Sequence, residues 1–133
     1  MKLTVIYLVV IISVICVHVK STLGLNRNIY DSIDIDEVLS NDRLLKRYTD
    51  CVLDKVTVRC PKESREMKKD ITITLESKCG DCTDGDKKKL KKVIEFLIKN
   101  KKETWDELKA KFDPNDKYMK QYEDMVKEGG VTF

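Results

Sequence analysis

The amphipathic stretch "TDGDKKKLKKVIEFLIKN", residues 83–100, constrains the fold more than any other feature of the sequence. Its apolar residues recur with a helical period and form one stripe along a helix. The stripe consists of Leu90, Val93, Ile94, Leu97 and Ile98. Thr83 and Asp86 stand three residues apart at its start, as an N-cap pair does. Such a stripe must be buried, so the rest of the chain has to supply apolar faces that cover it.

Shorter segments with the same period provide these faces. We expect further helices over residues 34–39, 41–54, 60–70, 103–113 and 115–126. The segment "ITITL", residues 71–75, alternates apolar residues with threonine, which favours a strand. A lone strand would have no partner, so we expect a short helix or an irregular link there. The tail "EGGVTF" is expected to be mobile after Gly129 and Gly130. Five or six helices without a sheet predict an all-α domain.

The N-terminus carries a nearly unbroken apolar run, "LTVIYLVVIISVICVHV", after Met1 and Lys2. A membrane anchor is one interpretation, because the run approaches the ~18 apolar residues that a spanning helix needs. Its terminal position and the small residues Ser21 and Gly24 favour a cleaved signal peptide. We therefore predict a signal peptide over residues 1–24, cut after Gly24 with Ser21 as the alternative. Residues 25–133 would be one secreted, extracellular domain without stable membrane insertion.

Cleavage at that point changes the composition of the chain. It removes one of the five cysteines, Cys16, and the only histidine, His18. The count of lysine and arginine falls from 26 to 24, because Lys2 and Lys20 are lost, against 23 acidic residues. A nearly neutral domain lacks the basic excess of a nucleic-acid-binding protein. It also lacks the charge that would hold a protein on a lipid surface.

The remaining four cysteines lie at Cys51, Cys60, Cys79 and Cys82, the last two in a C-x-x-C step. A thioredoxin-like dithiol would follow a strand in a βαβ setting, which this chain does not offer. A four-thiolate zinc site would bring two close pairs, whereas eight residues separate the first pair. In a short secreted chain an even number of cysteines indicates disulfides, and four cysteines allow three connectivities. We interpret the C-x-x-C step as a structural disulfide element.

Residues with catalytic chemistry are scarce. The domain has no histidine, no G-x-S-x-G and no Gly-rich phosphate loop, so we predict no enzymatic activity, no cofactor and no metal site. The acidic group "DSIDIDE" lacks the glycine and the final glutamate of an EF-hand loop, and acids at a helix start explain it. The lysines around Leu90, including Lys89, are expected to form a solvated face, and a docking patch for an acidic partner is the alternative.

The cysteine pattern C-x8-C-x18-C-x2-C resembles that of the insect chemosensory proteins, the OS-D family. "YDSIDIDEVLSNDRLLKRYTDCVLDK", "CTDGDKKKLKKVIEFLIKNKKETWDELKAKFDPNDKY" and "KQYED" support the resemblance over almost the whole domain. It implies about six short helices around a hydrophobic channel, and the pairs Cys51–Cys60 and Cys79–Cys82. Many relatives have six residues between the first two cysteines, so the 56–59 loop should be longer here.

By that resemblance the chain is a monomeric carrier of small hydrophobic molecules, such as semiochemicals, long-chain aliphatic compounds or fatty acids. Aromatic residues with a polar tip, Tyr48 and Trp105 above all, could both pack against a ligand and orient its head group. The implied ligand-binding residues are Tyr30, Asp31, Ile35, Val38, Leu39, Leu45, Tyr48, Val52, Met67, Leu75, Val93, Ile94, Leu97, Trp105, Leu108, Phe112, Tyr118 and Tyr122. For every one of these residues plain core packing is the alternative, and for any single aliphatic residue it is the favoured one.

Two other functions stay open at this point. The first is a secreted signalling or developmental factor that acts through a receptor, which the resemblance also allows. It would have a solid core and one saturable protein partner. The second is a thiol oxidoreductase, which a free-thiol assay would reveal. A cavity with promiscuous lipid binding would favour the carrier.

Overall fold

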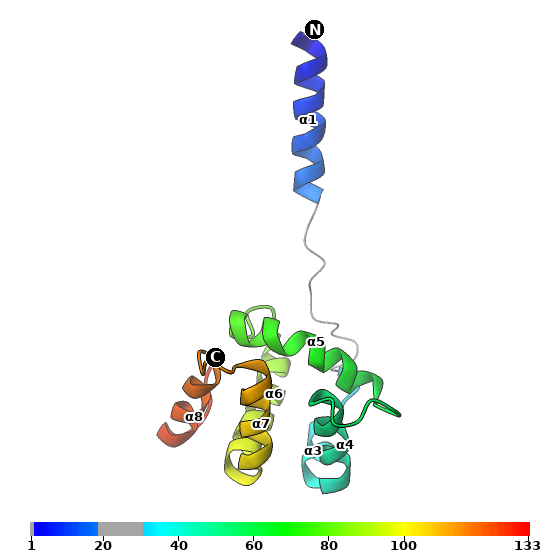
Figure 1. Ribbon diagram of the computed structural model, residues 1–133. Helices are drawn as coiled ribbons and strands as arrows, with labels where there is room; N and C mark the ends of the chain where they lie inside the picture. The colour runs from blue at the N-terminus through cyan, green and yellow to red at the C-terminus, as the bar shows by residue number, and fades with distance from the viewer. Residues whose placement is uncertain (1, 19–30) are drawn as a thin grey trace.

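The computed structural model describes residues 2–18 and 31–133 (Figure 1). All regular structure in these residues is α-helical, which confirms the predicted all-α class. The helices, with the labels of Figure 1, are α1 (Lys2–His18), α3 (Ile35–Ser40), α4 (Asp42–Val52), α5 (Lys62–Ser77), α6 (Asp84–Asn100), α7 (Lys102–Phe112) and α8 (Met119–Glu128).

Side-chain caps define where three of the helices begin. Asp34 accepts the Glu37 N–H at 3.0 Å before α3, and Asn41 accepts the Leu44 N–H at 3.1 Å before α4. Thr83 and Asp86 form the predicted reciprocal capping box at the start of α6, over 3.2 and 2.9 Å. Each cap satisfies backbone N–H groups that have no partner inside the helix, so the helix boundaries follow from local sequence.

The segment 71–75 continues α5 as a helix. Met67, Ile71, Thr74 and Leu75 lie at helical spacing and all face the interior of the molecule. Burial of this face outweighs the local preference of isoleucine and threonine for a strand, since α5 has no neighbouring strand in the described residues. Pro61 stands at the N-cap of α5, where the missing N–H is tolerated.

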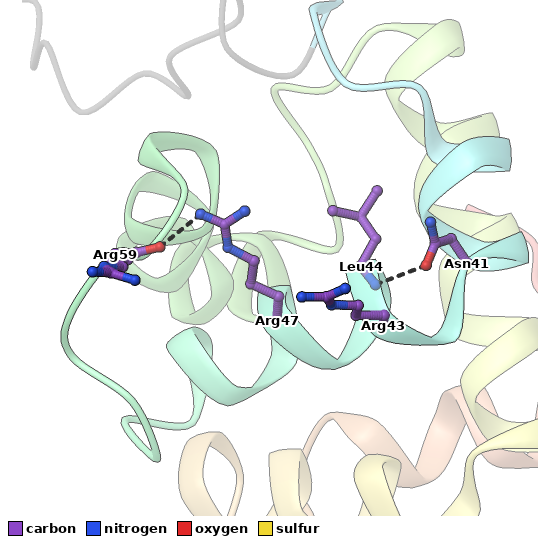
Figure 2. Close-up of a pocket in the computed structure, with 5 residues that line it drawn as sticks. All are labelled: Asn41, Arg43, Leu44, Arg47 and Arg59. Atoms are coloured by element: carbon purple, nitrogen blue, oxygen red, sulfur yellow. Dashed lines mark hydrogen bonds between the residues drawn. The ribbon is translucent and has the colours of Figure 1, made fainter.

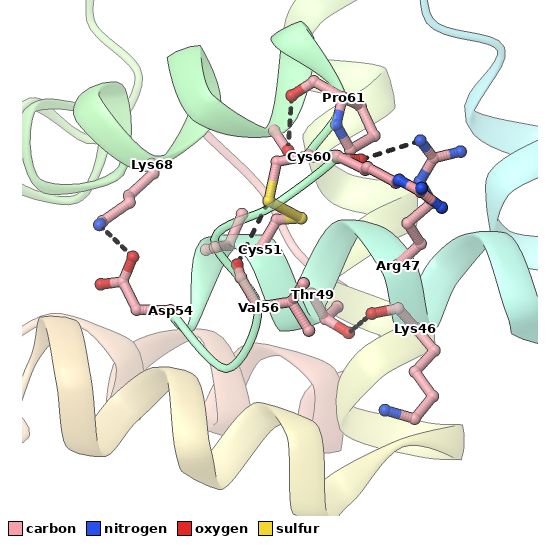
Figure 3. Close-up of a disulfide and its surroundings, with 12 residues drawn as sticks. Lys46, Arg47, Thr49, Cys51, Asp54, Val56, Cys60, Pro61 and Lys68 are labelled. Carbon is pink, nitrogen blue, oxygen red and sulfur yellow. Dashed lines mark hydrogen bonds and ion pairs between the residues drawn. A yellow bond between two sulfur atoms is a disulfide. The ribbon is translucent and has the colours of Figure 1, made fainter.

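Two disulfides fasten successive helices at their junctions, and they are the pairs that the resemblance implied. Cys51–Cys60 joins the last turn of α4 to the residue before Pro61, with 5.7 Å between the Cα atoms (Figure 3). Cys79–Cys82 closes the turn between α5 and α6, with 5.1 Å between the Cα atoms. Loops of this size contribute about 3 and about 2 kcal/mol in the chain-entropy model.

The helices α3 to α8 lie together in one bundle (Figure 1). Their buried side chains form one apolar core. α5 packs on α4, α4 on α3, and α6 contacts α3, α7 and α8, so α6 is the central element. The core holds Ile33, Val38, Leu39, Leu45, Val52, Leu75, Ile94, Leu97, Trp105, Leu108, Met119, Tyr122 and Val131.

The C-terminal tail belongs to this core, so the expectation that it is mobile was wrong. Val131 is 1% exposed, and its N–H donates to Glu95 Oε1 at 2.8 Å. The Phe133 ring lies 6.1 Å from the ring of Tyr122. Gly129 and Gly130 have φ of 132° and 136°, a backbone region that favours glycine. They turn the chain back onto the bundle instead of releasing it.

The helix α1 stands apart from the others (Figure 1). The apolar side chains of residues 3, 5, 6, 7, 8, 9 and 10 are exposed. Among the described helices, α1 included, none is both long and apolar enough to span a membrane. The predicted cleavage sites, Ser21 and Gly24, lie outside the described residues.

Candidate functional site: an apolar cavity between the helices

A cavity of about 230 Å³ lies between the helices, and each helix from α3 to α8 contributes to its wall. Its lining consists of Ile33, Ile35, Val38, Leu39, Leu45, Tyr48, Thr49, Val52, Met67, Asp70, Ile71, Thr74, Leu75, Cys79, Cys82, Asp86, Lys89, Leu90, Val93, Ile94, Leu97, Trp105, Leu108, Met119 and Tyr122. Most of these side chains are aliphatic or aromatic. The volume is below the range of about 300–1,000 Å³ that is usual for drug-sized ligands. A slender apolar molecule therefore suits it best.

The apolar stripe of residues 83–100 forms a large part of the wall. Leu90, Val93, Ile94 and Leu97 on α6 all line the cavity. Lys89 lines it as well and is half-buried, with its Nζ 3.4 Å from the Ile33 carbonyl oxygen. The expectation of a fully solvated lysine face was therefore wrong at this position, because Lys89 lies next to the apolar stripe.

Trp105 is held rigidly in the wall. Its side chain is 3% exposed, and its Nε1–H donates to Glu123 Oε1 on α8 at 2.7 Å. Lys109 Nζ reaches the same oxygen at 2.8 Å. Burial opposes ionisation of Glu123, but the hydrogen bonds from Lys109 and Trp105 outweigh it, so its pKa lies below its usual value. The indole N–H thus already has a partner, and Trp105 offers a ligand only its apolar ring.

Tyr122 also lines the cavity, and its polar tip differs from that of Trp105. The residue is 2% exposed, and its hydroxyl is the one buried side-chain polar atom in the described residues that has no hydrogen-bond partner. Burial raises the pKa of this hydroxyl, so it stays protonated and can donate or accept. A buried hydroxyl without a partner is unfavourable by about 1–3 kcal/mol. An oxygen on a ligand could supply that partner.

A buried carboxylate positions the helix that carries Tyr122. Asp113 is 5% exposed and accepts backbone N–H groups of Lys117, Tyr118 and Met119 at 2.9, 2.8 and 2.7 Å. Burial raises its pKa, yet the three hydrogen bonds together lower it by more, so the net pKa lies below its usual value. The charged form of Asp113 therefore fixes the start of α8 and, through it, Met119 and Tyr122.

Most of the predicted ligand-binding residues come together at this cavity. Those in its lining are Ile35, Val38, Leu39, Leu45, Tyr48, Val52, Met67, Leu75, Val93, Ile94, Leu97, Trp105, Leu108 and Tyr122. Burial and the nearby carboxylate of Glu63 raise the pKa of Tyr48, so it too stays neutral. The direct role of each residue in binding remains a prediction.

Four of the predicted residues are not part of this lining. Tyr30 lies outside the described residues, and Asp31 is exposed away from the cavity. Phe112 and Tyr118 are half-buried beside the core, where Lys111 and Lys117 lie over their rings at 5.5 and 5.0 Å. The helical period places Phe112 near Leu108 on α7. It cannot show that Leu108 lines the cavity whereas Phe112 does not.

Sequence reasoning missed several lining residues. Ile33 precedes α3, and Ile71 and Thr74 lie in the segment for which the sequence predicts either a short helix or an irregular link. Met119 follows Tyr118 by one residue, so it points to a different side of α8. The spacing of Met67, Ile71, Thr74 and Leu75 was the signal that could have placed α5 on the cavity.

Comparison with known proteins decides the family. Residues 27–120 match the insect pheromone-binding family A10/OS-D. The chain belongs to that family. Ejaculatory bulb-specific protein 3 of Drosophila melanogaster is 38% identical over 102 residues, which are 77% of this chain and 79% of the relative. Allergen Tha p 1 of Thaumetopoea pityocampa is 40% identical over 97 residues, 73% of this chain and 75% of the relative.

Solved structures of A10/OS-D proteins have the same fold. A chemosensory protein in complex with bromo-dodecanol is 43% identical, with a TM-score of 0.65 over 71% of this chain and 93% of that chain. Antennal chemosensory protein A6 from the moth Mamestra brassicae is 40% identical, with a TM-score of 0.63 over 76% of this chain and 97% of that chain. The predicted resemblance to insect chemosensory proteins is confirmed. Proteins of this family are ligand-binding carriers and not enzymes, as predicted.

Proposed function

We propose that this A10/OS-D protein is a secreted carrier that binds small aliphatic molecules with an oxygen at one end. One observation carries the proposal, the apolar cavity with the buried, unpartnered hydroxyl of Tyr122 in its wall. The aliphatic wall would hold a hydrocarbon chain, and the hydroxyl would bond the oxygen of an alcohol, aldehyde, ester or acid. The bromo-dodecanol complex of the relative supports this ligand class.

The apolar wall can supply a useful affinity. Burial of a twelve-carbon chain gains roughly 0.8 kcal/mol per methylene, or about 10 kcal/mol in all. Loss of translational, rotational and conformational freedom removes several kcal/mol of that gain. The remainder corresponds to a dissociation constant on the order of micromolar. Such an affinity allows both capture and release.

Secretion is part of the proposal and rests on the apolar N-terminal run. Expression of the full chain in insect cells, followed by N-terminal sequencing of the protein in the medium, tests it directly. A new N-terminus after Gly24 or Ser21 is the expected result. Retention of the intact chain with the cells would contradict the proposed signal peptide.

A cavity-filling variant tests binding in the cavity. Val93 lines the cavity on α6, so Val93→Phe should fill part of it and weaken displacement of a fluorescent lipid probe by dodecanol at least tenfold. Val126→Phe on α8 is the matched control, because Val126 is half-buried but not in the lining. Circular dichroism should show that both variants stay helical.

Equal binding by the wild type and Val93→Phe would place the ligand elsewhere. If the wild type bound no long-chain ligand at all, and if lipid extracts of natively produced protein were empty, the carrier function would be wrong. The alternative of a signalling factor with a receptor would then take its place.

A further inference from the structure

Three arginines form a concave surface away from the cavity. Arg43, Arg47 and Arg59 line a surface pocket together with Asn41 and Leu44, and all three are exposed (Figure 2). Arg43 and Arg47 stand one turn apart on α4, and Arg59 comes from the loop before α5. We refer to the three side chains as the arginine patch.

The arginine patch carries uncompensated positive charge. None of the three arginines forms an ion pair with another residue of the part of the chain that the structure describes. No acidic side chain lines the pocket. The nearly neutral net charge of the domain predicts no charged lipid-binding surface, but net charge does not describe a local excess of positive charge.

The loop geometry brings the third arginine to the other two. Arg47 Nη2–H donates to the Arg59 carbonyl oxygen at 2.9 Å (Figure 2). Arg59 has a φ of 61°, in the left-handed region that a residue with a side chain enters at a cost of about 1–2 kcal/mol. The Cys51–Cys60 disulfide fixes the adjacent position. The loop is therefore held with Arg59 next to α4.

The same loop exposes two aliphatic side chains. Val56 is 44% exposed and Val58 is 70% exposed, and Val58 directly precedes Arg59. Elsewhere in residues 31–133, Phe133 is the one other large apolar residue with comparable exposure. Guanidinium groups bind phosphate oxygens in a bidentate manner, and aliphatic groups favour the acyl boundary below the phosphates. An acidic protein would satisfy the arginines but would leave the function of the valines unexplained.

We propose that the arginine patch and the loop 56–59 form a docking surface for membranes with anionic phospholipids. The arginines bind headgroup phosphates, and Val58 enters the interface. The biological role of this docking rests on the proposed carrier function, because a carrier exchanges an apolar ligand most directly at a lipid phase. Docking itself needs no occupied cavity.

Vesicle binding tests the proposal. Protein purified from the medium of expressing cells is mixed with phosphatidylcholine vesicles, either pure or with about 30 mol % phosphatidylserine, in about 0.1 M salt. We expect clear binding to the anionic vesicles alone. The variant R43Q/R47Q/R59Q should lose about a hundredfold in partition coefficient, since each basic residue near an anionic surface contributes roughly a factor of five.

Matched variants separate this surface from general charge attraction. K88Q/K99Q/K127Q removes the same charge from exposed positions outside the patch and should stay within about threefold of the wild type. V56S/V58S should weaken binding without a change in its salt dependence. Equal losses in the two charge variants, or equal binding to neutral vesicles, would overturn the proposal.

Soluble anions distinguish the sources of phosphate. If inorganic phosphate or an acidic peptide bound the arginine patch while anionic vesicles did not, the patch would be a soluble-anion site and the membrane proposal would be wrong. Displacement of the lipid probe from the cavity is measured in parallel. If the lipid probe binds the cavity but the protein does not bind anionic vesicles, the docking proposal alone is wrong. If the protein binds vesicles but the probe does not bind the cavity, the carrier function alone is wrong.

Discussion

Replacement of Tyr122 by phenylalanine removes one atom, the buried hydroxyl that has no partner in the described residues. The ring, its burial and its contact with Phe133 stay the same. A buried hydroxyl without a partner costs about 1–3 kcal/mol, so its removal should stabilise the unliganded protein by about 1 kcal/mol. For a domain of this size that corresponds to a rise in Tm of about 4–8 °C.

The same variant should bind oxygenated ligands less tightly. A hydrogen bond between the hydroxyl and an alcohol contributes about 0.5–1.5 kcal/mol net, so Tyr122→Phe should weaken dodecanol binding roughly fivefold. Dodecane has no oxygen, and its affinity should be unchanged or slightly higher. The assay pairs thermal melts of the unliganded protein with probe displacement by the two ligands.

Tyr118→Phe is the control, because it removes a hydroxyl from a half-buried ring that does not line the cavity. It should change neither affinity. If Tyr122→Phe lowered the Tm, the hydroxyl would have a partner and the structural argument would fail. If the variant weakened dodecane and dodecanol equally, Tyr122 would act by packing alone.

Four further predictions follow from the same contacts. The emission of Trp105, the only tryptophan, should shift saturably with a long-chain alcohol and not with a short polar compound. Tyr48→Ala should weaken alcohol binding by about 1–3 kcal/mol, because Tyr48 lines the cavity. Phe112→Ala should leave the affinity nearly unchanged, because Phe112 does not line it. Ligand titrations measure both affinities, and circular dichroism checks that both variants are folded. Peptide mapping should find both disulfides and no free thiol, and reduction should lower the Tm but keep most of the helix. The pKa of Asp113 is lowered in the folded state, so its carboxylate stabilises the fold above about pH 4. Thermal melts at decreasing pH should show this contribution lost below that pH. The variant Asp113→Asn should lack the contribution at every pH.

Helix positions were predictable because their signals are local. The caps at Asp34 and Thr83, the end of α7 just before Pro114 and the 3.6-residue period each depend on a few consecutive residues. The 71–75 segment was not predictable with equal certainty, since its local preference for a strand is outweighed by burial against helices distant in the sequence. The prediction that the tail is mobile was wrong for the same reason, because the position of the tail depends on residues distant in the sequence. The contact of Val131 with Glu95 spans 36 residues, and no local pattern announces it.

The candidate site was predictable as a set of faces but not as a shape. Periodicity places Leu90, Val93 and Leu97 on one stripe, and that stripe does line the cavity. It cannot say whether opposing stripes close on each other or leave space. Nor could it show that Trp105 has its polar tip bound by Glu123 while Tyr122 does not, because these partners depend on how α7 and α8 are placed.

Both covalent bridges join residues that are close neighbours in the chain, nine and three positions apart. Two of the turns between helices are fixed by a disulfide, and neither disulfide joins helices on opposite sides of the cavity. The width of the cavity therefore depends on non-covalent contacts between side chains of different helices. Each dispersion contact contributes only about 0.1–0.2 kcal/mol, and hydrogen bonds between helices, such as that from Trp105 to Glu123, add to these contacts. We therefore expect the width of the cavity to adjust to the ligand that it contains.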